Sequence, residues 1–266
     1  MFLTSASANK KQISDLERMN LKGNIKTLLE IVQVIYENSE KSIIFNTITN
    51  FNIDGMIVEK RILKKHTLFS RLVYNYNSEN QITGFNDYNP DGSLYISVTY
   101  ETDEDGFVIA EHYDRSTQRL YDEKRQPIDV LNEEYYEKLF TDIYYKRDFK
   151  GYKLEEKYLK ANGSLSHKYL YSHNYKYYLV EKKYYNSANN LFYKTKYKYN
   201  EHGDSYKSTT FISHRLGYVT TFTYEYDVFD NWVKREETKE IEDNIFTKDV
   251  IRDLVVTDRI IQYYVQ

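Results

Sequence analysis

The sequence predicts an all-β protein: a long antiparallel meander of hairpin repeats, either a single extended sheet or a sheet rolled on itself, with one or two short helices. Three observations lead to this fold class. Tyrosine provides 30 of the 266 residues, tyrosine and lysine alternate through residues 193–199, and a Tyr-x-Tyr-Asn/Asp unit followed by a turn recurs along the chain. Aromatic residues favour the pleated surface of a sheet, and a period of two is typical of a strand.

Residues 193–207, with the sequence YKTKYKYNEHGDSYK, show the repeated unit most clearly. Up to Tyr199, tyrosine and threonine point to one face of the predicted strand and lysine to the other. Asn200 then begins a turn that reaches Gly203, because asparagine bonds its own backbone and glycine accepts a positive φ. We therefore expect one face of the sheet to pack and the other to stay in water.

Similar units divide the rest of the chain. They begin at Tyr74, Thr99, Tyr145, Tyr197 and Tyr224. Turn signals between them are Asp91-Gly92, Asn162-Gly163, Asn189-Asn190 and Gly217. Their spacing of about 12 to 14 residues fits one strand and one short turn, so we expect about a dozen strands or more.

Two segments have helical periodicity and set the predicted boundaries. Asn9–Met19 has the spacing of a short helix, with Asn9 and Gln12 placed as a capping box. After Pro127, apolar residues recur every four positions up to Ile143. The predicted divisions are a flexible or short helical N-terminus at 1–20, a first β-repeat array at 21–126, a short helical insert at 127–143 and a second β-repeat array at 144–266.

Composition and the first residues bear on the cellular compartment. The chain has no cysteine, which excludes disulfides and thiolate metal sites. No apolar run approaches the roughly 18 residues of a membrane-spanning helix, so we expect no transmembrane span. Ala6-Ser7-Ala8 has the small-x-small pattern of a signal-peptidase site, although the basic and apolar regions before it are missing. The segment is either the remnant of an export signal, which predicts a periplasmic or extracellular protein, or a polar N-terminus that leaves a cytoplasmic protein open.

The repeated unit resembles the tyrosine-aspartate (YD, or Rhs-type) repeat. The matching residues are Tyr74-Asn75-Tyr76-Asn77, Tyr197-Lys198-Tyr199-Asn200 with Gly203, and Tyr224-Glu225-Tyr226-Asp227. The last unit and residues 258–264 resemble the end of such proteins of Bacteroidetes type, with Asp230-Asn231-Trp232 in place of Gly-Asn-Trp. A weaker resemblance is to MORN-variant repeats, which are also short hairpins with tyrosine and glycine.

These resemblances imply functions but no catalytic residues. The tyrosine-aspartate repeat implies a secreted or surface β-sheet protein, carbohydrate binding or toxin encapsulation. The MORN-variant repeat implies an antitoxin or immunity role for some members. Neither family provides catalytic residues that transfer to this chain.

The charge distribution supplies the candidate binding face. Thr99 to Asp142 holds 13 acidic and 5 basic residues, whereas Tyr144 to Lys198 holds 13 basic and 4 acidic residues. Lysine beside exposed tyrosine suits a polyanion or a glycan, since the charge follows the polymer and the rings stack on sugars or bases. The alternative is a solvated sheet face whose lysines prevent edge-to-edge association. The candidate binding residues are Lys182, Lys183, Tyr184, Lys194, Lys196, Lys198 and Trp232.

Other candidate sites are weaker. Trp232 is either a sugar-stacking platform or a packing anchor that closes the sheet. The six histidines have no metal-ligand spacing, and Asp103-Glu104-Asp105-Gly106 begins like a calcium loop but lacks the later ligands, so we expect an acidic turn, no metal and no cofactor. Catalytic serine, phosphate-binding and zinc-protease motifs are missing. We therefore expect no enzyme, since a hydrolase would need two carboxylates that converge in a cleft.

Together these features predict a non-catalytic binding or scaffold protein of the bacterial envelope or surface. Its aromatic and basic face would bind a glycan or a protein. Nucleic acid is not expected as a partner, because the formal net charge is −3. The alternative is a cytoplasmic antitoxin or immunity protein that binds a toxin through Asp103, Glu104, Asp105 and Glu111.

Overall fold

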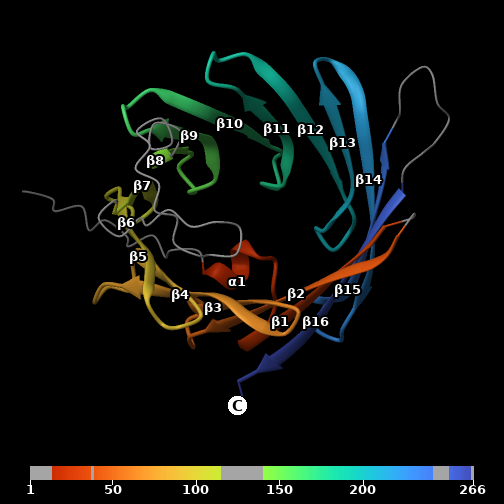
Figure 1. Cartoon of the computed structure of the whole chain (residues 1–266), viewed down its shortest axis with the longest axis horizontal. Helices are drawn as coiled ribbons and strands as arrows, with labels where there is room; N and C mark the ends of the chain where they lie inside the picture. The colour runs from red at the N-terminus through yellow and green to blue at the C-terminus, as the bar shows by residue number, and fades with distance from the viewer. Residues whose placement is uncertain (1–13, 37–38, 115–139, 242–251, 265–266) are drawn as a thin grey trace, which may run out of the picture.

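Sixteen antiparallel strands form a closed barrel (Figure 1). The structure is a computed structural model that describes residues 14–36, 39–114, 140–241 and 252–264. Each strand pairs with its neighbours in sequence, and β1 pairs with β16 to complete the ring. The elements are α1 (Asp15–Arg18), β1 (Ile25–Tyr36), β2 (Ser39–Phe51), β3 (Ile57–Lys64), β4 (Thr67–Tyr76), β5 (Ile82–Tyr88), β6 (Leu94–Thr102), β7 (Val108–Tyr113), β8 (Phe140–Arg147), β9 (Lys153–Lys160), β10 (Leu165–His173), β11 (Leu179–Tyr185), β12 (Leu191–Tyr199), β13 (Ser205–Ile212), β14 (Arg215–Tyr226), β15 (Trp232–Ile241) and β16 (Arg252–Tyr263).

The pairing of β1 with β16 overturns one part of the predicted fold. The all-β meander is present, but the single extended or rolled open sheet is wrong because the sheet closes. The register of this pair runs from Ile25 opposite Tyr263 to Tyr36 opposite Asp253. Closure satisfies the backbone groups that two free edges would expose. The alternation of side chains along each strand is the same in an open and in a closed sheet, so it does not predict closure.

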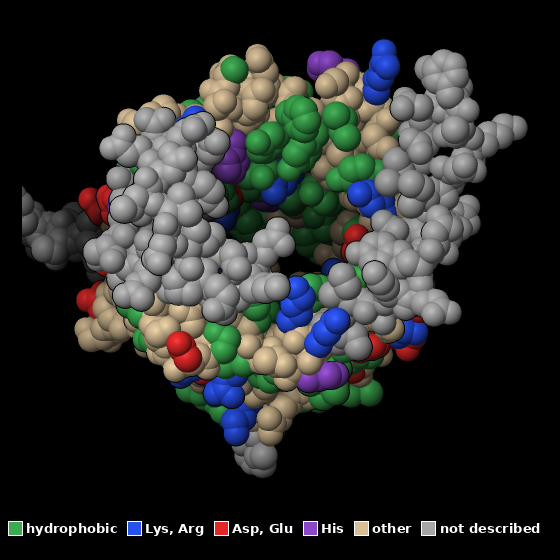
Figure 2. All heavy atoms as spheres, in the orientation of Figure 1, with side chains coloured by type: hydrophobic (Ala, Val, Ile, Leu, Met, Phe, Trp, Pro, Cys, Tyr) green, Lys and Arg blue, Asp and Glu red, His purple; other side chains and the backbone are tan. Residues whose placement is uncertain are grey.

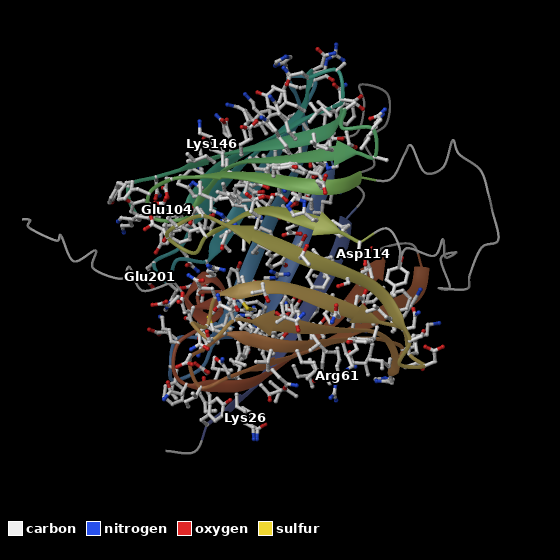
Figure 3. All side chains as sticks on the ribbon, turned by 90° about the vertical axis from the view of Figure 1, so that its left-hand side faces the viewer. Lys26, Arg61, Glu104, Asp114, Lys146 and Glu201 are labelled. Carbon is white, nitrogen blue, oxygen red and sulfur yellow. The ribbon has the colours of Figure 1, made fainter. Side chains whose placement is uncertain are left out.

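Seven similar turns form one end of the barrel, which we call the Asx end. They follow the even-numbered strands β2 to β14 and comprise residues 52–56, 77–81, 103–107, 148–152, 174–178, 200–204 and 227–231. Each begins with asparagine or aspartate, whose side-chain oxygen accepts the backbone N–H of the fifth residue. The fourth residue has a positive φ, as in a hairpin loop built from a type I turn and a bulge. Figure 3 shows Glu104 and Glu201 at this end and Asp114 at the other.

The Asx end explains the Tyr-x-Tyr-Asn/Asp unit. The asparagine or aspartate begins the turn, and the two tyrosines before it point to the inner face of the barrel. Tyr74 and Tyr76 on β4 are half-buried, whereas Asn75 between them is exposed. Lys26, Arg61 and Lys146 lie on the outside of the barrel (Figure 3).

Residues 14–24, which we call the N-terminal strap, cross the Asx end before β1 begins. The strap bonds to the turn at 52–56 through Leu16 N–H and the Gly55 carbonyl, 3.2 Å apart. It reaches the turn at 200–204 through Asn20 Nδ2, 3.2 Å from the His202 carbonyl. Figure 1 shows α1 inside the ring of strands. The buried apolar cluster of the protein lies here and consists of Leu16, Leu21, Ile25, Leu28, Phe51 and Ile57.

The predicted helices and divisions correspond to the following elements. Within the predicted helix Asn9–Met19, residues 9–13 lie outside the described residues, and α1 covers Asp15–Arg18. Ser14 and Glu17 form its capping box in place of Asn9 and Gln12. Within the predicted insert 127–143, residues 127–139 lie outside the described residues, and residues 140–143 belong to β8. Both predicted arrays contribute strands to one barrel.

Candidate functional site: the barrel lumen

The inner face of the barrel surrounds a hollow, the lumen, which is open in the view along the barrel (Figure 2). A barrel of about 16 strands is wide enough to leave such a space, because its diameter grows with strand number. Hydrophobic, histidine and basic side chains lie side by side on the wall that faces the hollow beneath β10 and β11 (Figure 2). Alternation along each strand decides which side chains line it.

Six tyrosines, one from each even-numbered strand from β4 to β14, form a layer on the inner face that we call the tyrosine ring. They are Tyr74, Tyr100, Tyr145, Tyr171, Tyr197 and Tyr224. Burial raises the pKa of all six hydroxyls, that of Tyr74 to about 12. Each stands three residues before the asparagine or aspartate of its turn. The recurring unit therefore places one tyrosine per hairpin at the same height in the barrel.

Glu156 is a buried carboxylate of the inner face that is bonded on several sides. It is 7% exposed and accepts the hydroxyls of Tyr158 at 2.5 Å and Tyr171 at 2.6 Å. The ammonium group of Lys153 lies 3.4 Å away. Burial raises the pKa of Glu156, but Lys153 and the two hydroxyls outweigh burial, and the net pKa is below its ordinary value. Glu156 is thus an ionised anchor for its neighbours.

A second carboxylate, Glu111 on β7, is held in a similar way. The hydroxyl of Tyr145 donates to it at 2.6 Å and that of Tyr113 at 3.2 Å. Burial, followed by the charge of Glu111, raises the pKa of Tyr145 well above its usual range. Both tyrosines therefore remain neutral donors, and the carboxylates of this wall are bonded by phenols of the wall itself.

The cations of the same wall lie over aromatic rings. The guanidinium of Arg147 is 5.1 Å and the ammonium of Lys153 is 4.3 Å from the Tyr145 ring centre. Lys182 Nζ lies 4.0 Å from the ring centre of Tyr169. Burial lowers the pKa of all three cations. An aromatic ring stabilises part of the charge of a cation, but it offers no oxygen lone pair to the N–H groups of that cation.

Beyond these cations, away from the Asx end, the inner face of β9 to β12 is almost wholly aromatic. The rings of Tyr158 and His167 stack at 4.1 Å, and those of Tyr184 and Tyr193 stack at 5.0 Å. Tyr169 lies between the two pairs, 5.3 Å from Tyr184. Offset and stacked rings of this kind present a broad apolar surface with polar tips. We call these five side chains the aromatic belt.

The structure divides the predicted binding residues between the two faces. Lys182 pairs in register with Tyr171 and Thr195, and Tyr184 pairs with Tyr169 and Tyr193, so both lie on the inner face. The opposite, outer face carries Lys183, Lys194, Lys196 and Lys198. The predicted lysine and tyrosine surface is therefore two surfaces on opposite sides of the barrel wall. Binding at either remains a prediction.

Trp232 lies on the inner face at the start of β15, away from the other predicted residues. It is 7% exposed, with the Arg259 guanidinium 3.3 Å from its ring centre and Tyr224 packed edge-on at 6.0 Å. Arg259 is in turn held by Glu30 at 3.0 Å. These contacts favour the packing-anchor interpretation over the sugar-stacking platform, since little of the ring is accessible.

The acidic residues of the antitoxin alternative do not form one surface. Asp103, Glu104 and Asp105 lie in a turn of the Asx end, where Asp103 accepts the backbone N–H of Asp105 and of Phe107. Glu111 instead bonds to tyrosines of the inner face. Among the described residues, no group of three or more His, Asp or Glu is arranged to hold a metal ion. No helix in the described part of the chain is long and apolar enough to cross a membrane.

Several solved structures are similar to this barrel to different degrees. A porin-like protein from Bacteroides uniformis has a TM-score of 0.57 at 9% identity, over 90% of this chain and 96% of that one. The chain is similar in fold to a porin-like protein. A porin-like protein from Bacteroides vulgatus has a TM-score of 0.43 at 13% identity, over 88% and 98% of the chains. A LolA superfamily protein from Nitrosomonas europaea has a TM-score of 0.27 at 7% identity, over 92% and 89%. These last two similarities are too weak to support an inference.

The comparisons correct the predicted family. No protein-family model and no curated protein matches the chain, so the tyrosine-aspartate repeat and MORN-variant resemblances are wrong as family assignments. The Tyr-x-Tyr-Asn/Asp unit arises here from the hairpins of the barrel. Each turn of the Asx end begins with asparagine or aspartate, and six of these seven turns have an inner tyrosine three residues before it. The similarity to the Bacteroides uniformis protein, at 9% identity, shows the fold alone.

Sequence reasoning missed Glu156 and Lys153, which no motif distinguishes from the many other charged residues. It names Glu111 only as part of the acidic toxin-binding segment, not as a carboxylate of the inner face. A signal was present for Glu156: on β9 it stands two residues before Tyr158, and therefore on the same face as a tyrosine. A charge on the tyrosine side of a strand is the exception in this chain.

Proposed function

We propose that the protein is a non-catalytic binding protein of the bacterial envelope that holds its ligand in the barrel lumen. The observation that carries this proposal is the inner face itself, where the tyrosine ring, the aromatic belt and buried charges surround a hollow (Figure 2). Ligand sites are concave and mostly aromatic or apolar, with a few placed polar groups. The porin-like fold is consistent with an envelope location.

The side chains on the outer face favour a barrel that is surrounded by water and not by lipid. Ion pairs lie in the middle of its strands. Arg61 and Arg71 pair with Glu59, Lys157 pairs with Glu155, and Lys183 pairs with Glu181. A barrel that spans a bilayer presents an apolar band to lipid, where a basic residue costs about 2–4 kcal/mol at the midplane. We therefore propose a carrier or receptor in an aqueous compartment of the envelope, with its ligand enclosed.

Two neighbouring lysines on β11 provide the test. Lys182 faces the lumen and Lys183 faces outward, and the chain has no native cysteine. Lys182→Cys and Lys183→Cys would each carry one thiol, and the rate of maleimide labelling would be measured with and without chloroform-soluble or water-soluble extracts of host cells. We expect one extract to slow labelling of the Lys182→Cys variant and to leave the Lys183→Cys variant unchanged.

Other outcomes would contradict the proposal. Slower labelling of the Lys183→Cys variant alone would place the ligand on the outer lysine face. Because Lys182→Cys itself removes a cation of the lumen, the wild-type protein is measured in parallel. If neither extract changes the labelling of either thiol and neither raises the Tm of the wild-type protein, lumen binding is wrong. If one extract does protect the Lys182→Cys thiol, the ligand can be extracted from the purified complex and identified by mass spectrometry.

A further inference from the structure

The inner wall between β8 and β11 changes in character along the barrel axis. At the Asx end, Arg147 on β8 lies directly opposite Lys153 on β9. Two strands further round, Lys182 on β11 lies opposite Tyr171. Beyond these cations, toward the other end, lies the aromatic belt. A polar cationic zone therefore adjoins an apolar zone on one continuous wall.

The carboxylates of this wall are already bonded. Glu156 accepts Tyr158, Tyr171 and Lys153, and Glu111 accepts Tyr145 and Tyr113. Three cations thus share the wall with two carboxylates, each of which already accepts two phenol hydroxyls. An ionised carboxylate accepts about four hydrogen bonds at most, so the phenols take about half of this capacity and the three cations share what is left.

The cations themselves have donors to spare. The guanidinium of Arg147 donates to the backbone carbonyls of Val108 at 2.7 Å and Gly151 at 2.9 Å, and both of these acceptors are neutral. Within the described residues, the ammonium group of Lys182 lies over the rings of Tyr169 and Tyr171, at 4.0 and 5.6 Å, and forms no ion pair. An ammonium group has three N–H donors, and charge-assisted bonds to an anionic oxygen are about twice as strong as neutral ones.

We propose that Arg147, Lys153 and Lys182 form a subsite for the negatively charged oxygen head group of an amphiphile whose apolar body lies along the aromatic belt. This inference rests on the proposed lumen binding and names the ligand class of that site. The tyrosine rings beneath the cations fix their positions, so little order is lost when the head group binds. Carboxylate and phosphate share the required chemistry.

The experiment measures binding of four probes by titration calorimetry: decanoate, decyl phosphate, decanol and glucose 6-phosphate. Decanol lacks the charge, and glucose 6-phosphate lacks the apolar body. We expect the protein to bind decanoate or decyl phosphate at least about tenfold more tightly than decanol, and glucose 6-phosphate more weakly than either anion. The tighter of the two anions identifies the head group as carboxylate or phosphate.

Matched variants locate the head group. Lys182→Gln should weaken anion binding by about tenfold and leave decanol binding unchanged, whereas Lys183→Gln on the outer face should change neither. Lys153→Gln, with Lys157→Gln as its outer-face control, provides an independent pair. In the Lys153→Gln variant Glu156 still accepts the hydroxyls of Tyr158 and Tyr171, so we expect this variant to fold. The conclusion therefore does not rest on the Lys182 variant alone.

The outcomes separate this inference from the function on which it rests. Equal binding of decanoate, decyl phosphate and decanol, or anion binding insensitive to both luminal lysines, overturns the head-group subsite but keeps lumen binding. Preference for glucose 6-phosphate overturns the apolar body and indicates a phosphorylated sugar. Failure of all four probes, together with unprotected thiols in the preceding experiment, overturns the lumen as the binding site.

Discussion

Asn231 should be the residue on which closure of the barrel depends most. It is 1% exposed and its side chain joins three segments of the chain. Its Oδ1 accepts the Lys22 N–H at 2.7 Å, and its Nδ2 donates to the Lys22 carbonyl at 2.9 Å and to the Tyr263 hydroxyl at 3.0 Å. The N-terminal strap, the last turn of the Asx end and the end of β16 meet at this one amide.

Asn231→Ala removes these three hydrogen bonds. At about 1 kcal/mol each, the free energy of unfolding should fall by about 3 kcal/mol, because the backbone groups of Lys22 also lose their partners. An unfolding entropy of about 2.1 cal/mol/K per residue amounts to roughly 0.56 kcal/mol/K for the whole chain. Tm should therefore fall by roughly 5 °C, measured by circular dichroism or scanning calorimetry.

A second readout tests the reason for the change. The Lys22 side chain is already exposed, but its backbone is held by Asn231. Release of this backbone should let trypsin cleave there faster in the Asn231→Ala variant than in the wild type. Asn75→Ala, which alters an exposed asparagine between two inner tyrosines of β4, is the control and should change neither Tm nor cleavage. A shift in Tm of less than about 1 °C, or a large shift with an unchanged rate of cleavage after Lys22, would refute the account of Asn231 as the closing residue.

Three further substitutions have defined outcomes. Gly84→Ala should cost about 3 kcal/mol or more by denaturant unfolding, since its φ is +148° and a Cβ there would lie 2.0 Å from the Val98 carbonyl oxygen. Glu156→Gln should cost about 2 kcal/mol at pH 7. Folding lowers the pKa of Glu156, so the unfolded chain takes up the proton first as the pH falls. The stabilisation by ionised Glu156 is therefore fully present above about pH 4.5 and is lost as the pH falls through the pKa of the folded protein. Trp232→Ala should cost about 3–5 kcal/mol through lost burial and lost contact with Arg259.

Each of these substitutions has a matched control. Gly92→Ala has the same sign of φ with nothing within 4 Å of the added Cβ, so a loss equal to that of Gly84→Ala would show that the clash is not the cause. Glu155→Gln on the outer face removes only an ion pair with Lys157 and should cost less than about 1 kcal/mol at pH 7. If the acid limb of the stability profile is the same for Glu156→Gln as for the wild type, the lowered pKa of Glu156 is contradicted. Trp232→Phe should retain most of the stability, and if Trp232→Ala leaves unfolding unchanged, the residue is no packing anchor.

The sequence predicts the strands and turns of this protein better than it predicts their closure. Alternation through residues 193–199 correctly separates an inner tyrosine face from an outer lysine face, because this pattern depends only on local geometry. Closure depends on contacts such as Asn231 with Lys22, which are 209 residues apart, and no local pattern encodes them.

The sequence predicts one residue of the candidate site but not its neighbours from distant strands. Lys182 was singled out for its charge, and it lies on the inner wall. The predicted binding face also includes Lys183, but neighbouring residues of a strand point to opposite faces, and Lys183 lies on the outer one. The wall around Lys182 could not be predicted, since Arg147 on β8 reaches it only through the folded order of four strands.

The seam between β1 and β16 has a consequence for biosynthesis. β1 is made early, yet its partner residues 253–263 follow more than 200 residues later. During that interval one margin of β1 has no strand beside it, and its run of leucine, isoleucine and valine is available to any other extended chain. Pairing across such a long loop is slow because the ends must first find each other. A holding chaperone that recognises apolar extended segments would therefore act most strongly on nascent chains that have emerged past β2 but not yet past β16.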